Sequence, residues 1–179
     1  FGRRAPAEGA QARGPQSPRD SHAKLAVPLQ TVYDGDSVRV NVNGKQLDIR
    51  VPKGVKPGQV IRLAGQGTNG GNLLLEIEYA AHPQFEVDGR NIIFVLPVTP
   101  WQAAMGATLS VPTLGGPVDV KIPADSDSGR KLRLRGRGLP GAPAGDQIIE
   151  LEVTAPRAGS EDQRQAYRDL AKAFGEKAS

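Results

Sequence analysis

Apolar and polar residues alternate along much of this chain, and a period of two is typical of strands that turn one face toward a core. Between two of the alternating stretches, the pair Asn43-Gly44 is a strong signal for a tight hairpin turn. The polar positions would form a solvated face, as in an antiparallel sheet that covers a core on one side. The alternating stretches are residues 25–29, 38–42, 47–51, 60–63 and 72–79.

The same pattern occurs a second time at a constant distance along the chain. Segment 51–67 begins Val-Pro and ends Arg-Leu-Ala-Gly-Gln-Gly, and it recurs in the same length as segment 122–138, which begins Ile-Pro and ends Arg-Leu-Arg-Gly-Arg-Gly. Such a repeat indicates a duplicated module. Segment 100–106 begins with Pro and is long enough for one helical turn. The sequence therefore predicts a mostly β fold: two tandem small antiparallel β-sandwich-like modules with short helical turns, then one C-terminal α-helix.

A capping box followed by an apolar stripe predicts the C-terminal helix. Ser160 and Gln163 have the spacing of the box, and Gly175 lies where the helix would stop. One Tyr, one Leu and one Phe then fall at i, i+3 and i+7, which places them on one helical face. Such a stripe either packs on the neighbouring module or pairs two chains, and both alternatives are open at this point. The stripe consists of Tyr167, Leu170 and Phe174.

These patterns divide the chain into four segments. Residues 1–21 are rich in Gly, Pro and Arg and lack apolar periodicity, which predicts a flexible tail. We expect the first β module at residues 22–81, the second at 82–156, and the helix at 159–176. Because the sequence begins with Phe1 rather than Met, we also expect the tail to continue a longer chain.

Composition narrows the possible functions. The 179 residues include no cysteine, which excludes disulfides, thiolate catalysis and cysteine-ligated zinc and is compatible with a cytoplasmic protein. No stretch of eighteen apolar residues is present, so no membrane-spanning helix is predicted. The net charge is +4, but the tail carries four arginines against two acidic residues and so holds half of it. The charge of the remainder is weak support for a polyanion partner.

The candidate chemical motifs do not form a catalytic or metal site. The Gly-rich segments 65–70 and 136–141 have the letters of a phosphate-binding loop, but a strand rather than a helix follows the first, so we expect turns. His22 and His82 are the only histidines and are far apart in the sequence. A possible pair of carboxylates occurs once in each repeat, which favours a duplicated polar strand face over an acid–base pair. We therefore expect no enzyme, no cofactor and no metal. The two carboxylate pairs are Glu76 with Glu78 and Glu150 with Glu152.

A run of basic residues marks one strand of the second module. Three of its arginines alternate with Leu132 and Leu134 and would line one exposed face, which could bind DNA phosphates or an acidic protein tail. Runs of this size are also common on solvated strands that bind nothing, and both alternatives are open. The run comprises Arg130, Lys131, Arg133, Arg135 and Arg137.

Several of these motifs, in this order, resemble a known family. The two β modules, the Phe1-Gly2 of the tail, the repeated phrase, and His82-Pro83-Gln84-Phe85 followed by Asp88-Gly89 resemble the C-terminal client-binding region of the DnaJ family of J-domain co-chaperones. The chain has no CxxCxGxG repeats, which makes it similar to the zinc-free class, and segment 97–106 looks most like the curved DNA-binding protein A subgroup. The resemblance covers residues 23–174.

This resemblance implies a shallow apolar groove on the first module that accepts hydrophobic side chains of an unfolded client polypeptide. Positions 25 and 27 share one face of their strand, as do 38 and 40, which is consistent with a groove. They would also share a face if they were ordinary core, and the sequence does not separate the two. The implied groove positions are Leu25, Val27, Val38, Val40 and Leu75.

The resemblance also implies partners. The second module would act as a spacer, and the stripe of the terminal helix would join two chains as a homodimer. The family's J domain is not among these residues, so we expect no stimulation of DnaK ATPase by this chain. The expected function is a co-chaperone fragment that binds unfolded polypeptides for delivery to a DnaK-type chaperone, in the cytoplasm and away from membranes. The alternative is an architectural, nucleoid-associated DNA-binding protein that uses the basic strand, recognisable by a steep salt dependence.

Overall fold

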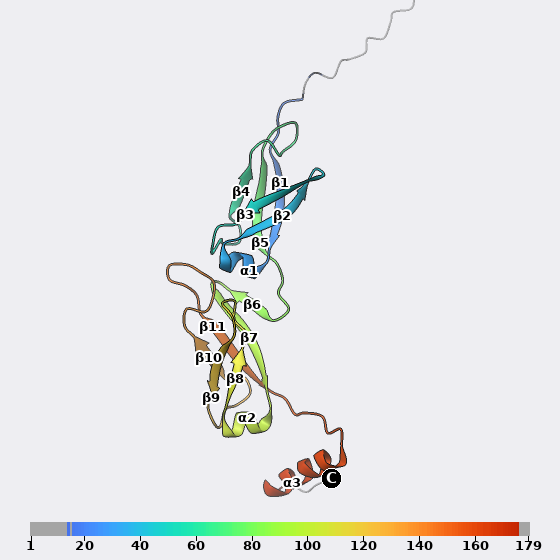
Figure 1. Cartoon of the computed structure of the whole chain (residues 1–179), viewed down its shortest axis with the longest axis vertical. Coiled ribbons are helices and arrows are strands. Elements are labelled where there is room, and N and C mark those ends of the chain that lie inside the picture. The colour runs from blue at the N-terminus through green and yellow to red at the C-terminus, as the bar shows by residue number, and fades with distance from the viewer. Residues whose placement is uncertain (1–13, 15, 176–179) are drawn as a thin grey trace, which may run out of the picture. The chain divides into compact units, whose positions relative to one another are not determined.

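Figure 1 shows a computed structural model that describes residue 14 and residues 16–175. The chain separates after His82 into two compact units. We refer to the residues up to His82 as module one and to those from Pro83 as module two. Both modules consist mainly of strands, so the predicted mostly β fold class is confirmed.

Module one contains a three-stranded sheet, a separate hairpin and a short helix. Its elements are β1 (Ser21–Val27), α1 (Leu29–Asp34), β2 (Ser37–Val42), β3 (Lys45–Arg50), β4 (Val60–Leu63) and β5 (Leu73–Tyr79). In the sheet, β5 lies between β1 and β4, while β2 and β3 pair with each other. The turn of this hairpin places Asn43 and Gly44 at φ of 51° and 80°, as the Asn-Gly pair predicts.

Module two contains a four-stranded sheet, a second hairpin and two helices. Its elements are β6 (Phe85–Asp88), β7 (Asn91–Val98), α2 (Pro100–Met105), β8 (Ala107–Val111), β9 (Val118–Ile122), β10 (Lys131–Leu134), β11 (Gln147–Val153) and α3 (Glu161–Ala173). The sheet has the order β10-β11-β7-β6, and β8 pairs with β9. The predicted terminal helix is confirmed as α3, which begins with the predicted capping box between Ser160 and Gln163.

The two modules repeat the same plan, as the sequence repeat predicts. The distance along the chain from the start of α1 to the start of α2 equals the distance from the start of β4 to the start of β10. The hairpins keep the same register, since Val40 lies opposite Leu47 in one and Val111 opposite Val118 in the other. Strand β11 starts slightly later than this offset requires, because the loop before it is longer. Equivalent residues of the modules can therefore be compared directly.

The sheets are mixed rather than purely antiparallel. Strand β1 pairs with β5 in parallel, and β7 pairs with β11 in the same way, whereas the remaining pairs are antiparallel. The alternation of apolar residues reveals which face of a strand is buried, but it carries no information about strand direction. The antiparallel expectation holds for both hairpins and for the β4–β5 and β10–β11 pairs.

Each module has its own core of aliphatic side chains, with two phenylalanines in module two. The rings of Phe85 on β6 and Phe94 on β7 meet edge to face, with centroids 5.9 Å apart. The core of module one consists of Leu25, Val27, Leu29, Val32, Ile49, Val51, Val55, Leu73, Leu75 and Ile77. Both the sheet and the hairpin contribute to it.

The repeated glycine phrases form turns, as predicted from the strand that follows. Gly65 and its equivalent Gly136 have φ of 71° and 70°, a conformation that side chains with a Cβ rarely adopt. Gly67 serves a different purpose, because a Cβ there would lie 2.2 Å from the carbonyl oxygen of Asn72. The first glycine thus permits the turn, and the last permits close approach of two backbone segments.

Some local structure lies outside the sequence prediction. Helix α1 and strand β6 are too short for their periodicity to be recognised. The hydrogen bonds of module one also reach into the predicted tail, since Arg19 pairs with Thr68 and Asp20 accepts a hydrogen bond from the Asn72 backbone. The remainder of the predicted tail, residues 1–13 and 15, lies outside the described residues. None of the helices in the described part of the chain is long and apolar enough to cross a membrane.

Candidate functional site

The five predicted groove residues all lie in module one, but they differ in exposure. Leu25 and Val27 on β1 and Leu75 on β5 are buried, at 7%, 0% and 4% exposure. Val38 and Val40 on β2 are partly exposed. The structure therefore separates the set into three core side chains and two that offer surface, and only the second group is accessible to a ligand as the chain stands.

Two further residues on the hairpin belong with the accessible pair. Val42 and Leu47 are partly exposed, and Leu47 lies directly opposite Val40. The alternating pattern of the sequence already includes both residues. Val42 continues the alternation of Val38 and Val40, and Leu47 begins the alternating stretch after the turn. We refer to Val38, Val40, Val42 and Leu47 as the hairpin face.

The equivalent face in module two is more closed. Val111, the equivalent of Val40, is fully buried, and Thr113, the equivalent of Val42, is 8% exposed. The Gln147 side chain donates a hydrogen bond to the Pro112 carbonyl at 2.9 Å and so ties this segment to the sheet. The same backbone plan thus leaves all four positions partly exposed in module one and covers two of the four in module two, where Leu109 and Val118 stay partly exposed.

The free edge of β1 is a second difference. The Ser21 N–H donates to the Asn72 carbonyl, and the Val27 carbonyl accepts from the Ala80 N–H, so both ends of β1 bond toward the β5 side. Because hydrogen-bonding directions alternate along a strand, the even-numbered residues of β1 direct their N–H and C=O groups the other way. In the described part of the chain, no strand pairs with that outer edge. The outward groups belong to His22, Lys24 and Ala26.

In module two the corresponding edge is covered. Strand β7 is the equivalent of β1, and it pairs with β11 on one side and with β6 on the other. Phe85 of β6 is buried against this sheet and lies opposite Phe94. The extra strand removes the unpaired backbone groups that β1 retains.

The polar faces around the hairpin and β1 are solvated and paired. Arg39 donates to Asp48 on the neighbouring strand at 2.8 Å, and this hydrogen bond lowers the pKa of the Asp48 carboxyl below its ordinary value. The Lys24 Nζ lies 3.6 Å from the Glu78 Oε2, within the range of an ion pair. Among the described residues, no group of three or more His, Asp or Glu side chains could hold a metal ion.

The basic run of module two lies on and beyond β10. Lys131 and Arg133 are exposed on the strand, whereas Arg135 and Arg137 lie beyond its end. Of the three arginines predicted to alternate along one strand face, only Arg133 is therefore on the strand. Arg133 forms an ion pair with Asp146. The pKa of the Asp146 carboxyl is lowered because the Gly136 N–H donates to it and because Arg133 does so as well. One of the five cations is thus already paired.

At the equivalent positions, module one carries a single basic residue. Its strand β4 and the following turn have the same backbone plan, so the fold itself does not require the charges of module two. The exposed Val60 stands where module two has Lys131. The equivalents of the basic run are Gln59, Val60, Arg62, Ala64 and Gln66.

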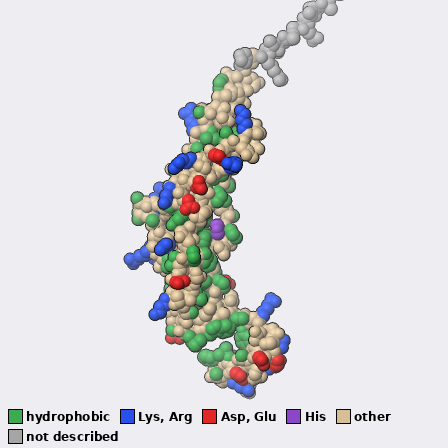
Figure 2. All heavy atoms as spheres, viewed as in Figure 1, with side chains coloured by type: hydrophobic (Ala, Val, Ile, Leu, Met, Phe, Trp, Pro, Cys, Tyr) green, Lys and Arg blue, Asp and Glu red, His purple; other side chains and the backbone are tan. Residues whose placement is uncertain are grey.

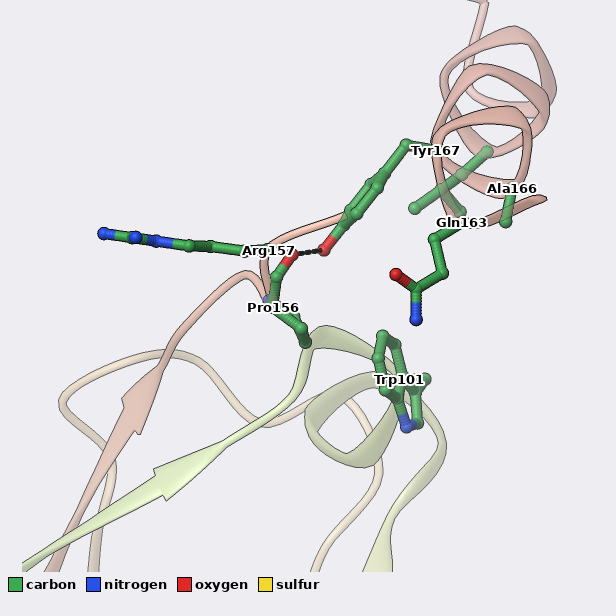
Figure 3. Close-up of a pocket in the computed structure, with 7 residues that line it drawn as sticks. Trp101, Pro156, Arg157, Gln163, Ala166 and Tyr167 are labelled. Carbon is green, nitrogen blue, oxygen red and sulfur yellow. Dashed lines mark hydrogen bonds between the residues drawn. The ribbon is translucent and has the colours of Figure 1, made fainter. Parts of the chain in front are cut away.

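The predicted helix stripe borders a pocket in module two. Figure 3 shows Gln163 of α3 pointing toward the Trp101 ring of α2, whereas Tyr167 points toward Pro156, whose carbonyl accepts a hydrogen bond from the Tyr167 hydroxyl. The pocket has a volume of about 280 Å³. Leu170 lines it and is 47% exposed, whereas Phe174 is 79% exposed and does not line it. The pocket is lined by Trp101, Pro156, Arg157, Gln163, Ala166, Tyr167 and Leu170.

Comparison with known proteins identifies the family. A family model described as the DnaJ C terminal domain matches residues 21–156. The curved DNA-binding protein of Coxiella burnetii is 40% identical over 176 residues, covering 87% of this chain and 56% of that protein. Chaperone protein DnaJ 2 of Synechocystis is 39% identical over 156 residues, covering 86% and 51%. Chaperone protein DnaJ 2 of Thermus thermophilus is 36% identical over 160 residues, covering 87% and 57%.

The chain spans about half the length of these relatives. The match to the family model runs from β1 past the end of β11 and so includes both copies of the module. The chaperone region that it describes is not enzymatic, which confirms that prediction. The resemblance inferred from the repeated phrases is therefore confirmed, and the chain belongs to the DnaJ family through its C-terminal domain.

Proposed function

We propose that this chain binds extended, apolar segments of unfolded polypeptides on module one, as the client-holding part of a co-chaperone that works with a DnaK-type chaperone. The client would lie along the outer edge of β1 and place apolar side chains on the hairpin face. Delivery to the DnaK-type partner would depend on a J domain, which these residues do not include.

The observation that carries the proposal is the difference between β1 and β7. Two copies of one fold differ in whether this strand edge is paired, and the copy with the free edge also has the more exposed hairpin face. A free edge gives backbone hydrogen bonds to any extended chain, whatever its sequence. Apolar contact adds affinity of about 25 cal/mol per Å² of buried surface. Edge hydrogen bonds and apolar contact together would give binding that is weak at each contact and tolerant of the client's sequence.

The hairpin face provides the test by mutation. Val38→Thr with Val40→Thr keeps the side-chain shape but adds two hydroxyls to the proposed contact. The matched control is Leu109→Thr with Val118→Thr, at partly exposed positions of the hairpin in module two. We expect the first variant to weaken binding of an unfolded client by about fivefold, which corresponds to roughly 1 kcal/mol less apolar stabilisation of the complex.

The measurement is suppression of aggregation of a chemically unfolded client over a range of protein concentrations. Circular dichroism and the thermal unfolding midpoint check that both variants are folded. Equal suppression by both double variants, each folded, would contradict a client site on the hairpin face of module one.

Dimerisation through α3 is the second part of the proposal. Leu170 and Phe174 leave large apolar surface exposed on a helix that has no buried residue of its own. A second copy of the chain would cover this surface. Two client sites in one dimer would then raise the overall affinity through effective concentration.

Binding to DNA is a second candidate function, favoured by one observation. Module two carries five basic residues where module one carries one, on a backbone plan that requires none of them. Two of the relatives at 35–40% identity, from Coxiella burnetii and Pseudomonas syringae, are named curved DNA-binding proteins. We propose that the exposed cations of this run would contact phosphates, apart from Arg133, which Asp146 already neutralises.

A further inference from the structure

The outer faces of the two sheets, which are turned away from the cores, differ on the equivalent strands β1 and β7. In module one, Lys24 on β1 forms an ion pair with Glu78 on β5. Val95 stands at the position of β7 that is equivalent to Lys24, and it is 46% exposed. Hydrophobic side chains reach the surface of module two at several places in Figure 2. Module two thus carries apolar surface where module one carries a paired cation. The outward residues are His22, Lys24 and Ala26 on β1, and Ile93, Val95 and Pro97 on β7.

Glutamates border the three outward residues of β7, which we call the apolar column, on both sides. Glu86 of β6 lies directly opposite Ile93. On the other side, Glu150 of β11 lies opposite Val95, and Glu152 follows on the same face of that strand. The ion pairs of the described residues include none of these three carboxylates. The column is therefore apolar at its centre and negatively charged along both borders.

The cations of β10 lie farther from the column. Lys131 is opposite Glu150, on the side of β11 that is away from β7, and Arg133 already pairs with Asp146. In the described sheet, no basic residue lies directly opposite Glu86 or Glu152. A partner that covers the column would therefore have to supply the positive charge that Lys24 supplies in module one.

The spacing of the two acidic borders suits an α-helix. Neighbouring strands lie about 4.8 Å apart, so β6 and β11 are separated by about 10 Å across β7. A helix with its side chains has a diameter of about 10–12 Å. A helix that lay along β7 would place an apolar stripe on the column. Lysines or arginines on the two borders of that stripe would then reach Glu86 on one side and Glu152 on the other.

We propose that the outer face of module two binds a basic amphipathic helix of another protein, with its apolar stripe on Ile93 and Val95 and its cations on the bordering glutamates. This surface is separate from the client site proposed for module one. Charge complementarity favours such a helix over DNA, because the glutamates would repel phosphates. It also disfavours the chain's own α3 from a second copy, because Arg164 and Arg168 of that helix already pair with Glu161.

Two synthetic helical peptides test the inference against the full chain. Both carry the same stripe of leucines, and the borders of the stripe are lysines in one peptide and glutamates in the other. Fluorescence anisotropy of the labelled peptides measures their affinities. We expect the lysine-bordered peptide to bind at least about tenfold more tightly than the glutamate-bordered one, and its binding to weaken as salt is added.

The repeat supplies matched variants for this measurement. Val95→Lys gives module two the residue that module one has at the same position, and we expect it to weaken binding of the lysine-bordered peptide by about tenfold or more. Val60→Lys makes the reciprocal exchange at an exposed position of module one, where module two has Lys131, and should leave the affinity unchanged. Glu86→Gln with Glu152→Gln should weaken binding and reduce its salt dependence. Circular dichroism checks that each variant is folded.

The outcomes separate this inference from the proposed function. Equal affinity for the two peptides, or tight binding that persists in a folded Val95→Lys variant, would overturn it. Binding that is lost in Val38→Thr with Val40→Thr but kept in Val95→Lys would assign the peptide to the client site of module one and would also overturn it. Self-association that Val95→Lys abolishes, measured by sedimentation, would make a second copy the occupant instead of a basic helix.

Discussion

At the scale of single residues, the duplication provides an internal control. Val40 and Val111 occupy equivalent positions, yet one is partly exposed and the other fully buried. Gln30 and Trp101 are equivalent as well, and one is polar while the other is a half-exposed aromatic. Because both members of each pair fold on the same plan, the fold alone does not determine which residue is present. These differences support the separate binding roles that we propose for the two modules.

Asp146 supports a prediction about the pH dependence of stability. Its carboxylate accepts hydrogen bonds from the Gly136 N–H and from Arg133, which lower its pKa from the ordinary value of 3.8. A lowered native pKa contributes stability above the unfolded-state pKa, and this contribution is lost as the pH falls through the native one. We therefore expect Asp146→Asn to lower the unfolding midpoint at pH 7.

The difference from the unaltered chain should begin to narrow below about pH 4, where the unfolded chain binds a proton at this carboxyl, and should disappear as the pH falls through the lower native pKa. Asp119→Asn, on the exposed face of β9, is the control and should have little effect at either pH. Denaturant unfolding at a series of pH values measures both variants. If the loss of unfolding free energy caused by Asp146→Asn stayed constant from pH 7 to pH 3, the Asp146 charge would not contribute to stability as proposed.

At the scale of elements, the two edge strands carry the two candidate functions. The free edge of β1 presents backbone groups with few charges beside it, whereas β10 presents cations. These surfaces suit different ligands, because a polypeptide client is held by apolar area and edge hydrogen bonds, and a nucleic acid is held by phosphate contacts. Salt concentration therefore distinguishes the two activities.

Charge reversal in the turn after β10 tests the DNA candidate. For Arg135→Glu with Arg137→Glu we expect weaker binding to duplex DNA and a smaller salt dependence, by about 0.9 in the log–log slope for each phosphate that the variant no longer neutralises. Lys45→Glu with Lys56→Glu, exposed in module one, makes the same change in net charge and is the control. Fluorescence anisotropy of a labelled duplex measures both. If the two variants lose affinity equally, the basic run is not a specific DNA site.

At the scale of the whole molecule, the sequence predicts the plan better than the details. The constant offset between the repeated segments, the Asn43-Gly44 turn and the capping box at Ser160 lead directly to the observed modules, hairpin and helix. The alternation of apolar residues carries no information on strand direction. The parallel pairing of β1 with β5 is therefore recognised only in the structure. The same holds for the covering strand β6, which is only four residues long.

The candidate site shows the same limit. Parity along the strands correctly places Leu25 with Val27 and Val38 with Val40 on shared faces, but it does not separate core from surface. Burial divides the set, because its members on β1 and β5 lie in the core of module one, whereas its members on β2 are partly exposed. The family resemblance supplies the expectation of a groove, and the open edge of β1 becomes visible only when the strands are paired.

In the proposed mode of binding, a client chain adds as a further strand to the outer edge of β1 in module one. Residue-resolved amide hydrogen exchange, with and without an unfolded client, tests it most directly. We expect client binding to slow exchange at the outward N–H groups of His22, Lys24 and Ala26, and to leave exchange in the equivalent strand β7 unchanged because β6 already covers its edge. Client binding that leaves these three amides unprotected, or that instead protects module two, would contradict it.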